Sequence, residues 1–111
     1  MTLTETGSGA ATYANNSVSA ESGVATFTGL TVTYTASADQ EAFALQAAGG
    51  GLTTANSSSL TSDVVATQLV YTTQPSGSVS GSALSTQPVV AARDANNVTD
   101  TDFTETVTLT E

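Results

Sequence analysis

The sequence contains no cysteine, no histidine and no lysine, and Arg93 is its single basic residue. Without these side chains, there is no Ser-His-Asp or Cys-His nucleophile system, no Schiff-base lysine and no zinc site of ordinary ligand type. The absence of cysteine also means that the sequence gives no indication of the redox compartment. We therefore expect that the protein is not an enzyme.

Positive charge is almost missing, since ten acidic residues stand against one basic residue and the formal net charge is -9. Such a charge repels nucleic acid and anionic membranes, so we expect neither as a direct partner. No apolar run reaches the 18 residues that a membrane-spanning helix needs, which excludes membrane insertion. The first residues lack a basic region followed by an apolar run, so we expect any export signal to lie outside this sequence.

Short alternating segments rich in threonine fill the sequence and predict β-strands almost throughout. The predicted strands are Thr2 to Thr6, Ala11 to Ala14, Val24 to Thr28, Leu30 to Thr35, Glu41 to Ala48, an edge strand within Leu52 to Asp63, Gln68 to Thr73, Pro88 to Arg93 and Phe103 to Thr110. Turns are predicted at Gly7 to Gly9 and at Ser37 to Gln40. This number and spacing of strands indicates an all-β, antiparallel β-sandwich.

For one of the predicted strands, Glu41 to Ala48, a helix is the alternative. The segment Glu41 to Ala48, EAFALQAA, contains good helix formers, but about two turns is marginal for a helix and three glycines follow it. We therefore predict a strand there.

The core has few bulky residues, and the expected large fillers are Phe27, Phe43, Phe103, Tyr13, Tyr34 and Tyr71.

The stretch from Ala66 to Asp94 has the character of the start of a β-domain, although it lies in the middle of the chain. Two strand candidates are joined by a connection of Gly, Ser and Ala, and Pro75 and Pro88 stand at strand ends, where a missing N–H is tolerated. A domain that starts here has only half of its length left before Glu111.

The two ends of the sequence carry the same tetrapeptide. Residues 2 to 5 and residues 108 to 111 both read Thr-Leu-Thr-Glu, 106 positions apart. A period near 100 residues is typical of an array of whole domains rather than of a solenoid. The duplication therefore indicates that this sequence spans slightly more than one period of a tandem repeat.

The segments TQLVYTTQP, STQPVVAARDANN, ETVTLTE, SGVATFTGLTV and EAFALQAAGGGLTTANSSSL together cover nearly the whole chain. They resemble successive strands of the immunoglobulin-like repeats that occur in tandem in very large bacterial surface and secreted proteins. Asn97 departs from the glycine usual at that turn of the family, although asparagine tolerates the same left-handed backbone. The resemblance implies an immunoglobulin-like sandwich at the cell surface or outside the cell.

Relative to that family unit, the order of strands in this chain is rotated. Residues 1–64 resemble the C-terminal half of one repeat, and residues 65–111 resemble the N-terminal half of the next. The poles of such a sandwich lie ~25–30 Å apart, and the joint Ser62 to Thr67 is too short to return across that distance comfortably.

We therefore expect each half to be completed by a neighbour, either another copy bound head-to-tail or an adjacent repeat of one covalent array. The residues expected to form the strand between subunits or repeats are Thr2, Leu3, Thr4, Glu5, Val107, Thr108, Leu109 and Thr110.

One acidic loop is a candidate metal site. Asp94, Asn96, Asp100 and Asp102 fall within it, and oxygen ligands at such spacing can hold calcium. The loop lacks the glycine and the bidentate glutamate of an EF-hand, and an acidic solvated turn is the alternative interpretation. No other cofactor is expected.

These observations favour a structural unit of an extracellular filament or surface stalk. The alternative is an adhesin domain that binds a glycan or protein ligand through its loops, against which the sequence offers few exposed aromatic residues.

Overall fold

The computed structural model describes residues 1–7, 11–35 and 38–111. The chain is all-β, with antiparallel pairing in every sheet and no helix in the described ranges. It divides into two compact units, unit 1 (Met1–Asp63) and unit 2 (Val64–Glu111). The residues that the structure describes include no helix long and apolar enough to cross a membrane.

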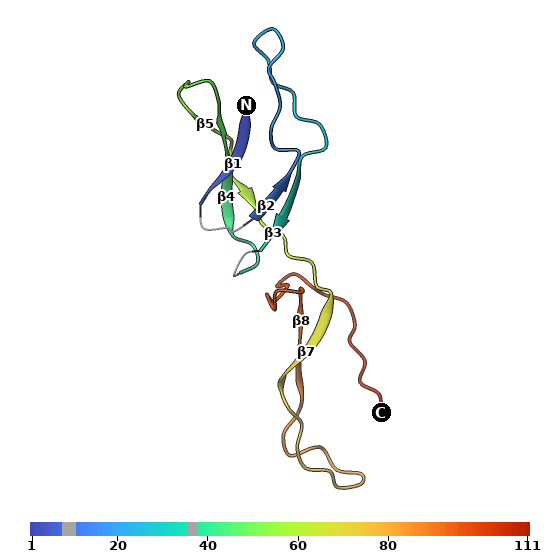
Figure 1. Cartoon of the computed structure of the whole chain (residues 1–111). Coiled ribbons are helices and arrows are strands. Elements are labelled where there is room, and N and C mark those ends of the chain that lie inside the picture. The colour runs from blue at the N-terminus through green and yellow to red at the C-terminus, as the bar shows by residue number, and fades with distance from the viewer. Residues whose placement is uncertain (8–10, 36–37) are drawn as a thin grey trace. The chain divides into compact units, whose positions relative to one another are not determined.

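The described residues of unit 1 form six strands, in the blue to green part of the chain in Figure 1. They are β1 (Thr2–Gly7), β2 (Ala11–Ala14), β3 (Thr31–Tyr34), β4 (Ala42–Ala48), β5 (Ala55–Asn56) and β6 (Leu60–Thr61). β4 is the central strand of the larger sheet, with β1 along one edge and the two short strands β5 and β6 along the other. The EAFALQAA segment is thus a strand, as predicted, because its neighbours on both edges satisfy its backbone.

The second sheet of unit 1 is the pair β2 and β3. Asn15 follows β2 with a positive φ of 57°, and its side-chain amide donates to the Gly29 carbonyl oxygen at 2.9 Å. Tyr34 of β3 meets Phe43 of β4 edge to face, with ring centroids 5.6 Å apart, so this aromatic pair joins the two sheets. Phe43 is 4% exposed and is the buried aromatic side chain at the centre of unit 1.

The turn after β4 depends on glycine. Gly50 and Gly51 both have positive φ, 61° and 70°, and the Leu52 amide donates to the Gly49 carbonyl oxygen at 3.1 Å. Two consecutive positive φ values define the tight turn that suits an antiparallel connection. The three glycines therefore end β4 abruptly and return the chain toward β5.

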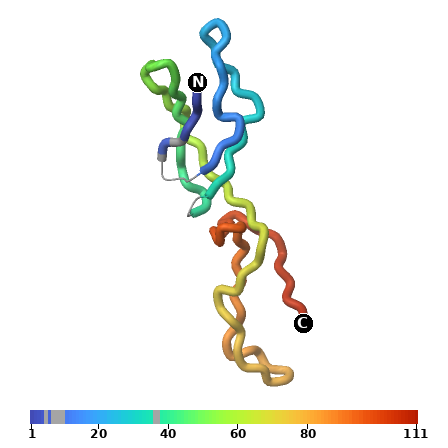
Figure 2. Tube along the Cα trace, in the orientation of Figure 1, coloured from blue at the N-terminus to red at the C-terminus, as the bar shows by residue number. Residues whose placement is uncertain are grey.

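Unit 2 contains one two-stranded ribbon, β7 (Gln68–Thr73) and β8 (Val89–Arg93), with a register shift between Tyr71 and Thr73. Its buried hydrophobic side chains are only Val64, Ala92 and Val98 among the described residues. Figure 2 shows that beyond the ribbon the red end of the chain is a single extended run. Unit 2 thus has one ribbon and one lone segment.

Several predicted strands agree with the structure, and two do not. The predictions for β2 and β7 match their observed bounds, and those for β1, β3, β4 and β8 overlap them closely. Val24 to Thr28 is not a strand, because its backbone forms no ladder with the described residues, and only Val24 bonds back to Glu21 in a tight turn. Phe103 to Thr110 is likewise extended, without a ladder partner in the part of the chain that the structure describes.

The expected large core residues are only partly buried. Tyr71 was predicted to fill the core, but it is 45% exposed because the face of the ribbon on which it stands is incompletely covered. Phe27, Phe103, Tyr13 and Tyr34 are intermediate in exposure. The turn predicted at Gly7 to Gly9 lies mostly outside the described residues, and so does the first residue of the turn predicted at Ser37 to Gln40.

Candidate functional site

The N-terminal copy of Thr-Leu-Thr-Glu forms most of β1 and is paired along β4. Thr2, Leu3, Thr4 and Glu5 stand opposite Ala48, Ala47, Gln46 and Leu45 in an antiparallel ladder. Thr6 adds a weaker side-chain bond from its hydroxyl to the Ala44 carbonyl oxygen, at 3.4 Å. This copy of the tetrapeptide is therefore an integral strand of the larger sheet.

A second neighbour flanks the start of β1 on its other edge. The Leu3 amide donates to the Asn16 carbonyl oxygen at 2.8 Å, and the Asn16 side-chain amide donates to the Leu3 carbonyl oxygen at 2.9 Å. Val18 donates its amide to the Met1 carbonyl oxygen at 2.9 Å. The start of β1 is thus hydrogen-bonded on both edges, as an interior strand is.

The C-terminal copy of the same tetrapeptide has no such neighbours within residues 1–7, 11–35 and 38–111. No backbone hydrogen bond joins residues 103–111 to any part of the chain that the structure describes. Val107 is 39% exposed and Leu109 is 53% exposed, although both belong to an alternating, β-prone pattern. The segment has the composition of a strand and an extended conformation, and neither edge is paired with any residue that the structure describes.

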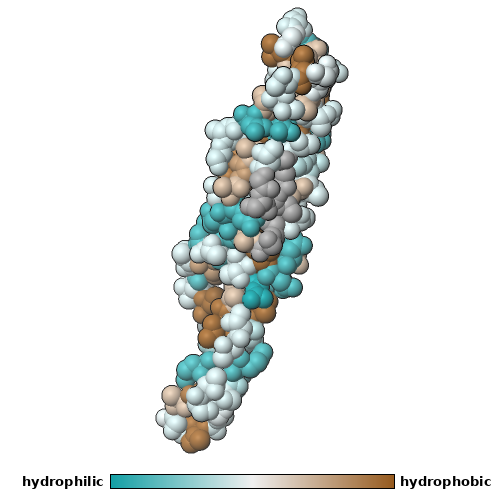
Figure 3. Space-filling view, turned by 90° about the vertical axis from the view of Figure 1, so that its left-hand side faces the viewer, coloured by the Kyte–Doolittle hydropathy of each residue, from teal (hydrophilic) through white to brown (hydrophobic). Residues whose placement is uncertain are grey.

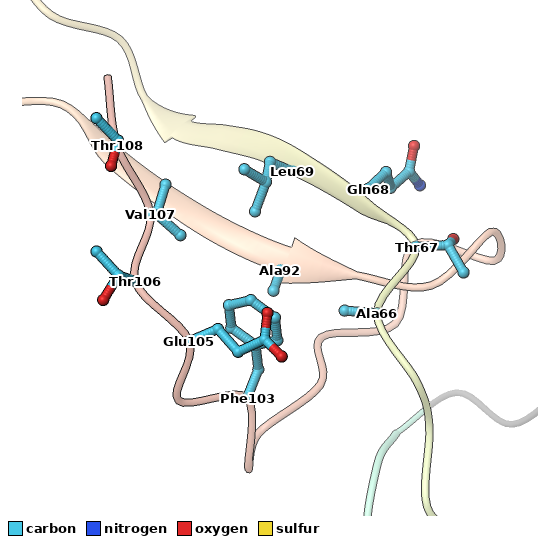
Figure 4. Close-up of a pocket in the computed structure, with 10 residues that line it drawn as sticks. All are labelled: Ala66, Thr67, Gln68, Leu69, Ala92, Phe103, Glu105, Thr106, Val107 and Thr108. Atoms are coloured by element: carbon cyan, nitrogen blue, oxygen red, sulfur yellow. The ribbon is translucent and has the colours of Figure 1, made fainter. Parts of the chain in front are cut away.

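The ribbon of unit 2 carries an apolar face that this segment only partly covers. Directly opposed residues of antiparallel strands share a face, so Leu69 with Ala92 and Tyr71 with Val90 form one apolar surface. Figure 4 shows Phe103 and Val107 of the extended segment lying across a groove from Leu69 and Ala92.

Coverage of this face is uneven. Ala92 is buried, whereas Leu69 is 54% exposed. On the side drawn in Figure 3, brown hydrophobic surface gathers over the part of unit 2 that holds the ribbon. A two-stranded ribbon is marginally stable in water unless further strands or another layer cover its apolar face. Unit 2 therefore has a two-stranded ribbon whose apolar face is partly covered by one extended segment.

The acidic loop of unit 2 uses its carboxylates to organise backbone. Oδ1 of Asp94 accepts hydrogen bonds from the amides of Asn96 and Val98, both at 2.9 Å. Oδ2 of Asp100 accepts from the Ala66 amide at 2.9 Å, and its Oδ1 is buried without a hydrogen-bond partner among the described residues. Asp102 is exposed.

These bonds have a plain structural role. They close the turn after β8 and fasten it to the chain just before β7, where Gln68 also donates to the Asp94 carbonyl oxygen at 2.8 Å. A carboxylate oxygen that accepts a hydrogen bond from a backbone amide has already used one lone pair. It can bind calcium only through the lone pairs that remain. Calcium binding at this loop stays a prediction.

Two parts of the candidate site were missed from the sequence. The edge formed by residues 16–18 beside β1 was not predicted from the sequence, because no local pattern in these residues indicates that they pair with a strand. The apolar face of the ribbon could have been found, since Leu69 and Tyr71 alternate in the segment QLVYTT.

A scan against protein-family models, a search of curated proteins and a search of solved structures each found no match to this chain.

Proposed function

We propose that this protein is a structural repeat unit of an extracellular filament or surface stalk, built from immunoglobulin-like half-domains that neighbouring copies or adjacent repeats complete. Unit 2 of one copy and unit 1 of the next would together make one sandwich. The chain then acts mechanically, by linking sandwich to sandwich in a head-to-tail series that does not close on itself.

The observation that carries this proposal is the contrast between the two copies of one tetrapeptide. Thr2 to Glu5 is paired within a sheet, whereas Thr108 to Glu111 is extended and has no backbone partner in the described ranges. The second copy also continues the segment that lies over the apolar ribbon face of unit 2. A strand that covers one half-domain and has the sequence of an integral strand of the other is what a joint between repeats requires.

Charge and composition fit the same role. A net charge of -9 on a chain with only one basic residue keeps the lateral surfaces of neighbouring filaments apart, while pairing through backbone and apolar contacts is little affected by that repulsion. The resemblance to tandem repeats of bacterial surface proteins supports an extracellular or cell-surface location.

Negative-stain microscopy of the purified chain, combined with sedimentation over a range of concentrations, tests the proposal. We expect beaded strings whose length grows with concentration and which separate into single chains of 11.0 kDa under denaturing conditions. Dispersed monomers at every concentration would contradict assembly of this chain and would favour the adhesin alternative.

A further inference from the structure

The duplicated tetrapeptide allows the contact between copies to be stated residue by residue. Within unit 1, Leu3 stands opposite Ala47, and its amide bonds to Asn16 on the edge away from β4. The N–H and C=O of one strand residue point to the same edge, so Leu3 and Ala47 form a non-hydrogen-bonded pair. In such pairs the two Cα atoms are only about 4.5 Å apart.

We infer that residues 107–111 of one copy take the place of residues 1–5 of a second copy, between β4 and residues 16–18 of that second copy. This inference rests on the proposed function. Leu109 then stands opposite Ala47, Thr108 opposite Ala48 and Glu111 opposite Leu45 of the second copy, and Val107 lies where Met1 lies in this chain.

Each backbone group of the incoming strand has a partner already defined by β1. The Leu109 amide meets the Asn16 carbonyl oxygen, and the Asn16 side chain meets the Leu109 carbonyl oxygen, as they do at Leu3. The Val107 carbonyl oxygen accepts from Val18, as Met1 does. Residues 107–111 can therefore make the backbone hydrogen bonds that residues 1–5 make at this place, and their own edges become paired.

The exchange also explains why the two half-domains would form one interior. The same strand that enters the sheet of unit 1 through residues 108–111 lies over the ribbon of unit 2 through Phe103 and Val107. If residues 107–111 pair with β4 of the second copy, the sheet that contains this β4 lies next to the donated strand. The sheet then extends the layer that this strand forms opposite Leu69 and Ala92 of its own copy. The ribbon face would then gain the second layer that it lacks.

The absence of cysteine from the chain makes a disulfide test clean. Full-length Ala47→Cys chains carrying a tag are mixed with full-length Leu109→Cys chains, unfolded and refolded together so that both copies of the strand compete for β4, and then oxidised. Because each chain has one cysteine, a tagged heterodimer can form only between copies. The predicted Cα separation lies within the range that a disulfide spans.

The matched control replaces Ala47→Cys by Leu45→Cys. Leu45 lies on the same face two residues along β4, a diagonal separation of about 7–8 Å that a disulfide does not span without backbone movement. Thr108→Cys with Ala48→Cys provides a second in-register pair. A double variant, Leu3→Cys with Ala47→Cys, verifies by its internal disulfide that the β4 cysteine is competent.

We expect heterodimer as the main product of both in-register pairs and a trace of it with Leu45→Cys. Equal or greater crosslinking at Leu45 would overturn the register. Strings seen by microscopy without crosslinking at Ala47 or Ala48 would overturn the exchange and leave the proposed function standing. Monomers without crosslinking would overturn both the exchange and the assembly of separate copies into a filament.

Discussion

Leu3 lies opposite Ala47 in the ladder between β1 and β4, and its backbone bonds to Asn16 on the other edge. Leu109 occupies the same place in the second copy of the tetrapeptide, where it has no backbone partner among the residues that the structure describes and a side chain that is 53% exposed. One sequence is thus found in two environments. The difference between them is the presence or absence of neighbouring strands.

A charge added to one face of the C-terminal segment should prevent assembly, and a charge added to the opposite face should not. Neither charge should prevent folding of the single chain. Leu3 is partly buried in β1 and Thr2 is exposed, so Leu109→Glu puts a carboxylate where the β1 register buries a leucine, and Thr108→Glu puts it in solvent. We expect Leu109→Glu to abolish string formation and Thr108→Glu to leave it nearly unchanged. Sedimentation at matched concentrations is the measurement.

Both residues are exposed in the single chain, so neither substitution should change its unfolding midpoint by more than the roughly 0.5 kcal/mol usual for surface positions. Loss of assembly in both variants to the same extent would show that charge alone, rather than the face of the strand, decides the outcome.

The interior of unit 1 should depend on Phe43 more than on any exposed apolar residue. Truncation by Phe43→Ala removes a side chain that is 4% exposed together with its edge-to-face contact to Tyr34, and we expect a loss of about 3–5 kcal/mol. Leu52→Ala is the control, because Leu52 is 72% exposed. Urea unfolding followed at amide signals of unit 1 checks this, and equal midpoints for the two variants would contradict it.

Local patterns predicted the strands well where turn residues bound them. β2 ends at Ala14, just before Asn15, whose positive φ breaks the strand, and β7 ends two residues before Pro75, so their bounds could be predicted from neighbours in sequence. The face of β4 that carries Phe43 followed from alternation. These properties depend on residues within a few positions of each other.

Pairing could not be predicted in the same way, because its cause lies far along the chain. The partner of Leu3 is more than forty positions away, at Ala47, and nothing near Thr108 or Leu109 indicates that no partner is available there. Alternation reports which side chains share a face and says nothing about which edge is satisfied. The edge beside β1 and the incomplete cover over Tyr71 therefore required the structure.

Ser62 should stabilise unit 1 through its side chain as well as its backbone. It is fully buried, its hydroxyl oxygen accepts the Glu41 amide at 2.9 Å, and its own amide donates to the Glu41 carbonyl oxygen at 2.8 Å. Ser62→Ala leaves the Glu41 amide without that acceptor, which should cost about 1–3 kcal/mol.

The control for this serine is Ser59→Ala, since Ser59 is exposed and makes only a long bond of 3.5 Å to the Leu60 carbonyl oxygen. Urea midpoints of the two variants are compared with that of the unsubstituted chain. A Ser62→Ala midpoint no lower than that of Ser59→Ala would show that the hydroxyl contributes nothing to stability.

The distal part of the β7–β8 hairpin should open when a methyl group is added at Gly77. A Cβ there would lie 2.9 Å from the Ser85 Cβ and still closer to its hydroxyl, beside the paired backbones of Ser76 and Thr86. Gly81 has a similar positive φ, 78° against 74°, but open space around it. Both alanine variants bear the cost of a positive φ, and only Gly77→Ala adds the clash.

Amide hydrogen exchange at Ser76 and Thr86 is therefore expected to be faster in Gly77→Ala than in Gly81→Ala, with little change at the amides of unit 1. Equal exchange in the two variants would mean that the loop accommodates the methyl group by moving Ser85.

Alkaline pH should destabilise unit 1 through Tyr34. Burial, and secondarily the negative charge of Asp63, raise the pKa of the Tyr34 hydroxyl above its ordinary value near 10. The unfolded chain then loses this proton first, so the stability due to the neutral hydroxyl is fully present below about pH 10 and is lost as pH rises through the folded pKa.

Tyr34→Phe keeps a ring against Phe43 but cannot titrate, so its unfolding midpoint should fall less between about pH 9 and about pH 11. Asp63→Asn removes the charge and should give an intermediate loss. If the unsubstituted chain and Tyr34→Phe lose equal stability over this range, titration elsewhere causes the alkaline destabilisation.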